Sequence, residues 1–172
     1  MNIEQLSDLL VNGKEVEYPK NFILQKQGKM ATKFWLLKKG IARYIYQQND
    51  KEFSGWFDFE NEIVGSIYSL TNLGLANETI QLIEDSVLVE FSISDFDVND
   101  ENFKNLKLQI LQHYFIELER RVKFFQSLDG KERYQYLLEY KAHFIQRIPQ
   151  NLLASFLGIT PESLSRIRGS VS

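Results

Sequence analysis

Four residues near the end of the chain carry side chains of types that can bind nucleic acid: Glu162, Ser163, Arg166 and Arg168. An arginine guanidinium can donate two hydrogen bonds to O6 and N7 of a guanine, and a glutamate can accept one from N4 of a cytosine. Arg166 is the best candidate for reading a base, with Glu162 four residues away on the same helix face as its partner. The two could also form a simple surface ion pair, and both roles are compatible. Ser163 and Arg168 are better suited to backbone phosphates.

The segment IPQNLLASFLGITPESLSRIR, residues 148–168, has the spacing of a helix-turn-helix, in which two helices cross around one small core. Counted from Gln150, every inward or turn position carries the expected residue type: Leu153, Ala154, Leu157, Gly158, Ile159, Leu164 and Ile167. Thr160 is a suitable N-cap for the second helix, and Pro161 suits its first turn. The alternative is an ordinary pair of packed helices, which does not require this spacing.

A long helix is predicted over residues 102–127. Its apolar residues are spaced 3, 4, 3, 4 and 3 apart, which is a heptad seam: Leu108, Leu111, Phe115, Leu118, Val122 and Phe125. Ile110 and Tyr114 add apolar groups on other faces, so this helix must be covered on more than one side. We expect the seam to pair two subunits of a homodimer. The seam is short for a coiled coil, and a single helix buried within one chain is the alternative.

Two further helices are predicted outside this seam. Asp129-Gly130 ends the long helix, and residues 131–148 then form another one, whose apolar side carries Tyr134, Leu137, Leu138 and Phe144. At the other end of the chain, Ile3, Leu6 and Leu10 have helical spacing and predict a short helix over residues 3–12, which Gly13 ends.

Between Val16 and Phe96, short runs of aromatic and β-branched residues alternate with turn residues. Seven or eight strands at this spacing predict a β-sandwich or barrel. Asn49-Asp50 separates two aromatic-rich runs and predicts a hairpin.

Charge is divided unevenly along the 172 residues. Residues 1–102 carry 9 Lys and Arg and 17 Asp and Glu, whereas residues 103–172 carry 11 and 6, so only the second part is suited to a polyanion. The sequence contains no cysteine, which excludes thiolate metal sites, iron–sulfur clusters and thiol catalysis. No signal peptide and no apolar run long enough for a membrane span are recognisable, so a cytoplasmic protein without a membrane partner is expected.

This order of parts resembles the Crp/Fnr family of bacterial transcription regulators, to which the cyclic-AMP receptor protein belongs. The segment LLASFLGITPESLSRIR is similar to the short members common in Bacteroidetes-type bacteria, and FWLLKKGIARYIY, with Gly40 at its turn, is similar to the family's strand–glycine–strand. The resemblance implies an α+β fold: an N-terminal β jelly roll like a cyclic-nucleotide-binding domain (1–101), a dimerisation helix (102–127) and a helix-turn-helix domain (128–172). Most members continue into a β-hairpin wing, and we expect this chain to lack it.

The resemblance also implies partners and a ligand pocket. The partners are double-stranded DNA with an inverted repeat, a second copy of the chain, RNA polymerase and a small-molecule effector. The pocket positions correspond to Gly65-Ser66, where cyclic-AMP binders have Gly-Glu, and to Ala76-Asn77, where they have Arg-Ser. Because the phosphate-binding arginine is missing, cyclic AMP is not expected to bind in the usual way. The effector is therefore another, unknown small molecule, and the alternative is that no ligand binds at all.

No cofactor and no catalytic site are predicted. A haem sensor would need an axial ligand in the β domain, but both histidines, His113 and His143, lie outside it. His113 and Glu117 could share a metal on one helix face, yet two ligands fall short of a site. The chain is therefore predicted to be a regulator, not an enzyme. The alternative is a ligand-binding or protein-interaction module whose helix-turn-helix no longer reads DNA, and salt-dependent binding to duplex DNA would separate the two.

Overall fold

The computed structural model describes residues 13–71 and 73–171, so the short helix predicted over residues 3–12 lies outside the described part. The chain forms two compact units, and the boundary between them falls between Tyr114 and Phe115. The longest helix, α2 (Glu101–Ser127), contributes its first turns to one unit and its last turns to the other.

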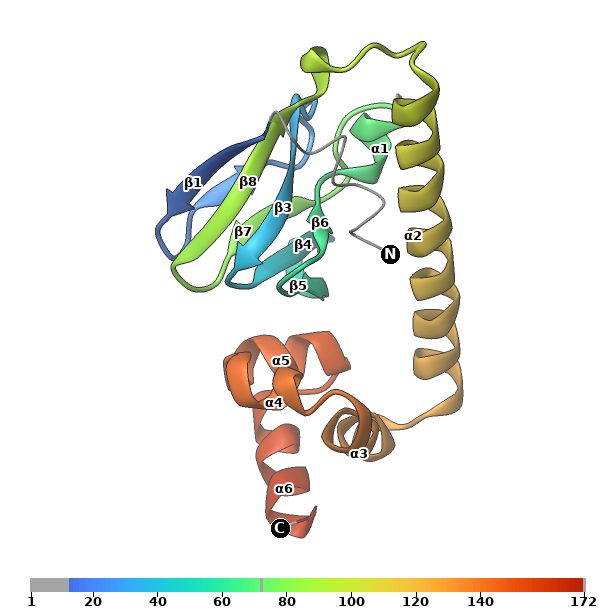
Figure 1. Ribbon diagram of the computed structural model, residues 1–172. Coiled ribbons are helices and arrows are strands. Elements are labelled where there is room, and N and C mark those ends of the chain that lie inside the picture. The colour runs from blue at the N-terminus through green and yellow to red at the C-terminus, as the bar shows by residue number, and fades with distance from the viewer. Residues whose placement is uncertain (1–12, 72, 172) are drawn as a thin grey trace. The chain divides into compact units, whose positions relative to one another are not determined.

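The first unit contains two antiparallel sheets of four strands each (Figure 1). One sheet has the order β1 (Lys14–Tyr18), β8 (Ser86–Ser92), β3 (Lys33–Lys39) and β6 (Ile63–Val64). The other has the order β2 (Ile23–Gln25), β7 (Thr79–Leu82), β4 (Ala42–Gln48) and β5 (Lys51–Asp58). This pair of strand orders is that of a jelly roll, which confirms the predicted α+β fold with a jelly roll in its first part.

Alternating side chains on β3 serve two separate cores, as strand geometry requires. Trp35 and Leu37 point between the sheets and pack in the core that also contains Leu88 of β8. Phe34 and Leu36 point to the outer face, where they pack in a cluster with two residues from the first turns of α2, Phe103 and Leu106. The start of α2 is therefore fixed to the jelly roll by buried apolar contacts.

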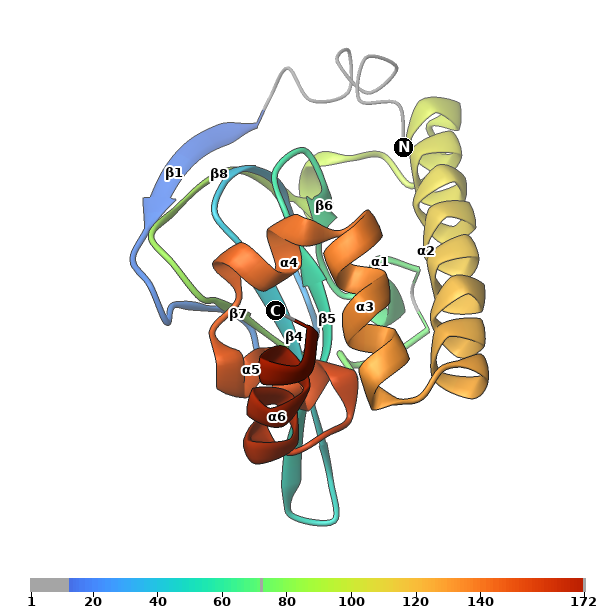
Figure 2. The same ribbon diagram turned by 90° about the horizontal axis from the view of Figure 1, so that it is seen from below.

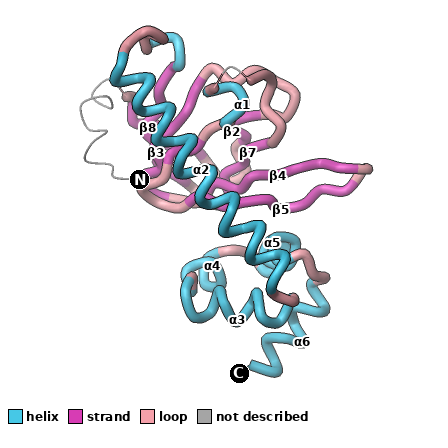
Figure 3. Tube along the Cα trace, turned by 90° about the vertical axis from the view of Figure 1, so that its right-hand side faces the viewer, coloured by secondary structure: helices cyan, strands magenta, loops and turns pink. Residues whose placement is uncertain are grey.

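Two turns of the jelly roll agree with the sequence prediction. Asn49 and Asp50 connect β4 and β5 with φ angles of 51° and 60°, the left-handed values that a tight two-residue hairpin requires. Figure 3 shows β4 and β5 as one long hairpin. Gly40 connects β3 and β4 with a φ of 117°, and a Cβ there would lie 2.1 Å from Ser86 Oγ, so no other residue fits. The described part of this unit also contains a short helix, α1 (Ile67–Leu70), and a 3-10 turn, η3 (Ile93–Asp95).

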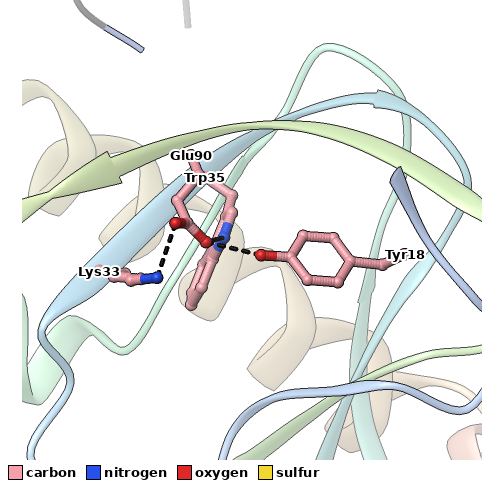
Figure 4. A network of polar contacts seen from close by, with 4 residues as sticks. All are labelled: Tyr18, Lys33, Trp35 and Glu90. Carbon is pink, nitrogen blue, oxygen red and sulfur yellow. Dashed lines mark hydrogen bonds and ion pairs between the residues drawn. The ribbon is translucent and has the colours of Figure 1, made fainter. Parts of the chain in front are cut away.

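A polar network around Glu90 joins β1, β3 and β8 (Figure 4). The Glu90 carboxylate accepts hydrogen bonds from Tyr18 Oη at 2.6 Å, Lys33 Nζ at 2.6 Å and Trp35 Nε1 at 3.0 Å. Burial raises the pKa of Glu90, but the three donors together outweigh it, so the net shift is downward. Burial and the Glu90 carboxylate raise the pKa of Tyr18 to about 12.

We expect Glu90→Gln to destabilise the protein by about 1–3 kcal/mol, since hydrogen bonds to a charged acceptor are lost. Because the folded pKa of Glu90 is lowered, its contribution is complete above about pH 4.3 and is lost as the pH falls through that folded pKa. The contribution of Tyr18 is complete below about pH 10 and is lost as the pH rises toward its folded value. Urea unfolding of both proteins across pH measures the difference, with the exposed Glu15→Gln as control. A difference independent of pH would contradict the assignment.

The second unit is helical and, besides the end of α2, contains four helices (Figure 2): α3 (Gly130–Tyr140), α4 (Ala142–Arg147), α5 (Gln150–Leu157) and α6 (Pro161–Val171). Asp129 caps α3 with a complete capping box, since its carboxylate accepts from the backbone of Glu132 and the Glu132 side chain accepts from the Asp129 backbone. The predicted helix end at Asp129-Gly130 is thereby confirmed.

The single helix predicted over residues 131–148 is wrong, because the backbone leaves the helical region at Lys141, with φ −141° and ψ 48°. The break separates α3 from α4, and Phe144 of α4 then packs against Phe156 of α5, with ring centroids 5.6 Å apart. Leu138, predicted on the apolar side, is 40% exposed, whereas Tyr134 and Leu137 are buried as expected. The packing of α4 on α5, which the periodicity does not reveal, accounts for the break.

Candidate nucleic-acid interface and ligand site

Helices α5 and α6 form the predicted helix-turn-helix. Leu153, Ala154 and Leu157 of α5 and Leu164 of α6 are buried, so the inward positions form one small core. Ala154 is fully buried, which explains why a small residue is needed there. Ile159 and Ile167 are partly buried at the edge of this core.

The turn between α5 and α6 depends on glycine at Gly158. Its φ of 70° and ψ of 30° are left-handed, and its N–H and that of Ile159 bond to carbonyls of the last turn of α5. Ile159 packs so close to the start of α3 that a Cβ on Gly130 would lie 2.7 Å from its Cγ2. Arg133 of α3 secures the same turn, because its Nη1 donates to the carbonyl of Leu157.

Two glycine-to-alanine substitutions in this motif are expected to have opposite effects on unfolding. Gly158→Ala should destabilise the protein by about 1–2 kcal/mol, because alanine must adopt the left-handed conformation. Gly169→Ala in α6 should stabilise it by up to about 0.5–1 kcal/mol, since a Cβ there meets no atom within 4 Å and alanine favours the helix. Thermal or urea unfolding measures both changes in stability. If both substitutions stabilised or both destabilised the protein, the assigned turn geometry would be contradicted.

The start of α6 is organised by Thr160. Its Oγ1 accepts a hydrogen bond from the Ser163 N–H at 3.2 Å, which confirms Thr160 as the N-cap, and its carbonyl accepts from Leu164 N at 3.0 Å. The Glu162 carboxylate also lies at this helix start, where its own backbone N–H, the Thr160 hydroxyl and, to a smaller extent, the charge of Arg166 lower its pKa.

The four predicted DNA-binding side chains lie on α6 with different exposure. Glu162 and Arg166 are exposed, whereas Ser163 and Arg168 are partly buried. Arg166 Nη2 donates to Ser163 Oγ at 3.2 Å, so its side-chain partner in the free protein is Ser163. Its predicted partner Glu162 acts on it only through charge. A weakly held guanidinium at an exposed helix position is available to a ligand.

The predicted dimer seam is largely uncovered. Five of its six residues are exposed: Leu108, Leu111, Phe115, Leu118 and Val122. The sixth, Phe125, is partly buried in the second unit, where its ring lies 4.8 Å from the Arg133 guanidinium and makes an edge contact with Phe156. Leaving this many large apolar side chains in water is unfavourable, which makes the face a candidate interface.

The predicted ligand-pocket residues lie in two segments of the jelly roll. Gly65 and Ser66 precede α1, Ser66 is buried, and the Gly65 N–H bonds to Tyr44 Oη at 3.2 Å. Ala76 is buried and Asn77 is exposed. The two segments are neighbours, because the Ser66 hydroxyl lies near enough to Glu78, the residue after Asn77, to lower its pKa, although burial is the larger effect and raises it.

Beside these segments lies a buried acid held by two aromatic donors. Asp58 accepts hydrogen bonds from Tyr44 Oη at 2.7 Å and from Trp56 Nε1 at 2.8 Å. Burial, with a contribution from the charge of Glu62, raises the pKa of Asp58 to about 8, although the two donors oppose the shift. Burial raises the pKa of Tyr44 well above its ordinary value, and the charges of Asp58 and Glu78 add to this effect.

Comparison with known proteins finds matches in structure but none in sequence. No protein-family model matches the chain, and no curated protein matches it. FixK2 from Bradyrhizobium japonicum is 15% identical, over 94% of this chain and 85% of its own, with a TM-score of 0.77. The c-di-GMP-responsive global regulator CLP of Xanthomonas campestris is 15% identical, over 99% and 91%, with a TM-score of 0.72. A CRP/FNR family transcriptional regulator from Thermus thermophilus is 13% identical, over 92% and 85%, with a TM-score of 0.70.

The chain has the Crp/Fnr fold. Within this fold, the sequence prediction missed three side chains near the pocket segments: Tyr44, Asp58 and Glu78. Glu78 could have been noticed, since it directly follows the Ala76-Asn77 pair. Tyr44 and Asp58 gave no signal, because their proximity arises only from the pairing of β4 with β5.

The described residues contain neither a group of metal ligands nor a helix that could span a membrane. Over residues 13–71 and 73–171, no three His, Asp or Glu side chains are grouped to hold a metal ion. Among the helices of the same residues, none is both long and apolar enough to span a membrane.

Proposed function

We propose that this protein is a homodimeric, DNA-binding transcription regulator that reads base pairs with α6. The observation that carries the proposal is a helix-turn-helix with a buried core, a left-handed glycine turn and a capped second helix whose exposed face presents Glu162 and Arg166. In this arrangement the second helix enters the major groove with its first residues near the base edges. Arg166 would read a guanine, with Glu162 beside it, while Ser163 and Arg168 would contact phosphates.

The proposed dimer forms through the exposed seam of α2. A two-fold dimer presents two reading helices, so its site would be an inverted repeat with half-sites about one helical turn apart. The solved proteins of the same fold include transcriptional regulators, which supports a role in reading DNA. RNA polymerase is a further proposed partner.

The jelly roll would act as the sensor, and a signal there would shift the seam helices and thus the spacing of the two reading helices. Cyclic AMP in the usual mode is not the proposed effector. Ala76 supplies no cation for a phosphate, and Glu78 places a buried carboxyl nearby, which an anionic group would avoid. We propose no iron–sulfur cluster and no haem.

A second candidate function is a module that binds a ligand or a protein but no DNA. The net charge of −8 over residues 1–102 and the exposed apolar seam of α2 favour it. The net charge of +5 over residues 103–172 and the capped, exposed α6 oppose it. A catalytic function is not proposed, and two of the solved proteins compared above are described as regulators.

Selection of bound fragments from a random duplex library at low salt tests the proposed function. Enrichment of an inverted repeat whose affinity falls steeply with salt is the expected result, because neutralised phosphates release counterions. A protein that enriches no sequence and whose weak binding is independent of salt would instead favour the second candidate function.

A further inference from the structure

We propose that the jelly roll binds a small organic cation, bearing a protonated amine or a guanidinium, whose N–H groups bond to Glu78 and Ser66. This inference rests on the proposed function, since it names the class of effector that the sensor domain takes.

The first reason is a pair of buried polar atoms that lack partners. Ser66 is 2% exposed and Glu78 is 3% exposed. Neither Ser66 Oγ nor Glu78 Oε1 has a hydrogen-bond partner among residues 13–71 and 73–171. An unpaired buried polar atom costs about 1–3 kcal/mol, so such atoms are rare and require an explanation. A ligand that donates to both would supply it.

The second reason is that the two atoms lie close together. They come from two different loops, the one before α1 and the one before β7, and the Ser66 hydroxyl lowers the pKa of the Glu78 carboxyl directly. It does so without a hydrogen bond of normal geometry, so both groups keep free capacity. One small donor group of a ligand could therefore reach both.

The nearest other acid does not compete for the same ligand. Asp58 also acts on Tyr44, as Glu78 does, but both of its oxygens already accept hydrogen bonds, Oδ1 from Trp56 and Oδ2 from Tyr44. Of these two buried acids, Glu78 alone has an unpaired oxygen in the described structure. Of the two acids, Glu78 is therefore the one that can accept a hydrogen bond from a ligand, through Oε1.

The charge of the surroundings selects a cation. No lysine or arginine among the described residues contributes to the pKa of Glu78, and the buried Arg43 is bonded elsewhere, to Ser54 and Glu52. Burial raises the pKa of Glu78 and so favours its neutral form, and a positive group brought to it would favour the carboxylate instead. A ligand ammonium or guanidinium would supply both the charge and the hydrogen-bond donors.

Thermal unfolding of the full chain with simple cations as probes tests the proposal. Methylammonium, guanidinium and 1,4-diaminobutane chlorides, below denaturing concentration, are compared with tetramethylammonium and sodium chlorides at equal ionic strength. Tetramethylammonium carries the same charge but no N–H donor. We expect at least one N–H cation to raise the unfolding temperature by a few degrees, through preferential binding to the folded state, and tetramethylammonium not to.

Two variants make the test specific. Glu78→Gln should raise the unfolding temperature of the protein without added probe and abolish the response to the N–H cations, while Ser66→Ala should weaken that response. Glu15→Gln, an exposed change of the same kind on β1, should leave the response intact. Equal temperatures in all salts, or a Glu78→Gln variant that is less stable than the parent, would overturn the proposal. Because unfolding requires no DNA, this result is separate from a failure of DNA binding.

Discussion

The Arg166→Ala variant is expected to bind duplex DNA without preferring any sequence. One bidentate contact between arginine and guanine discriminates against the wrong base by about 1–3 kcal/mol. A dimer makes this contact in both half-sites, so the loss is about 2–6 kcal/mol, or roughly 30- to 20,000-fold in specific affinity. Selection from a random library by the variant and the parent, side by side, measures it.

The variant should otherwise remain intact, which makes the result interpretable. Arg166 is exposed, and its side chain donates to the hydroxyl of Ser163, so its loss leaves the buried core of the motif untouched. Circular dichroism and sedimentation should therefore show the parent's fold and dimer. If the sequence preference survived in a folded Arg166→Ala dimer, another side chain would be the base reader.

Arg168→Ala provides the contrast. Because Arg168 is assigned to a phosphate in each half-site of the dimer, its loss should weaken binding to all sequences equally and reduce the salt slope by about two. The inverted repeat selected by this variant should be that of the parent. If the Arg168→Ala variant selected a different repeat, Arg168 would be a base reader and its assignment to a phosphate would be wrong.

The helix-turn-helix could be predicted from sequence because its constraints are local. Ala154 must be small where α6 crosses, Gly158 must adopt a left-handed conformation, and Thr160 must cap α6. All three lie within one stretch of seven residues. Residue type alone therefore specifies the geometry there. The hairpin at Asn49-Asp50 was predictable for the same reason, since both residues tolerate a positive φ.

The break at Lys141 could not be predicted in the same way. Residues 131–148 have a continuous helical pattern, and the packing of Phe144 against Phe156 that accompanies the turn between α3 and α4 is a tertiary contact that this pattern does not show. The candidate ligand site depends even more on tertiary structure. Its position directly after the Ala76-Asn77 pair marks Glu78 as a candidate, but its burial beside Ser66 arises only when the segments that precede β7 and α1 come together.

The partner of Arg166 was predicted from spacing alone, and the structure adds a detail that spacing cannot supply. Glu162 and Ser163 are both within reach of Arg166 along the helix, but Glu162 is drawn to the helix N-terminus, where the N–H groups and Thr160 favour its charge. The arginine is left to the weaker hydroxyl acceptor. It therefore needs to break one hydrogen bond to a neutral group when it turns toward a base.

The double variant Leu111→Asp/Leu118→Asp is expected to separate the dimer into monomers. The two leucines are 37% and 43% exposed in the single chain, so a partner helix could bury what remains. Complete burial of a leucine side chain contributes about 1.5–3 kcal/mol. Burying the remaining two fifths of four leucines in a dimer then contributes about 2–5 kcal/mol, before the cost of placing four carboxylates in the seam. Sedimentation over a range of concentrations measures the effect.

A matched control and a functional readout complete this test. Gln112→Asp/Gln126→Asp adds the same charge at two exposed positions of α2 outside the seam and should leave the dimer intact. The monomeric seam variant should keep its α6 geometry and bind a single half-site, yet lose the strong preference for a properly spaced inverted repeat, because its reading helices are no longer joined. A seam variant that remained dimeric would place the subunit interface elsewhere and leave the apolar face of α2 for another partner.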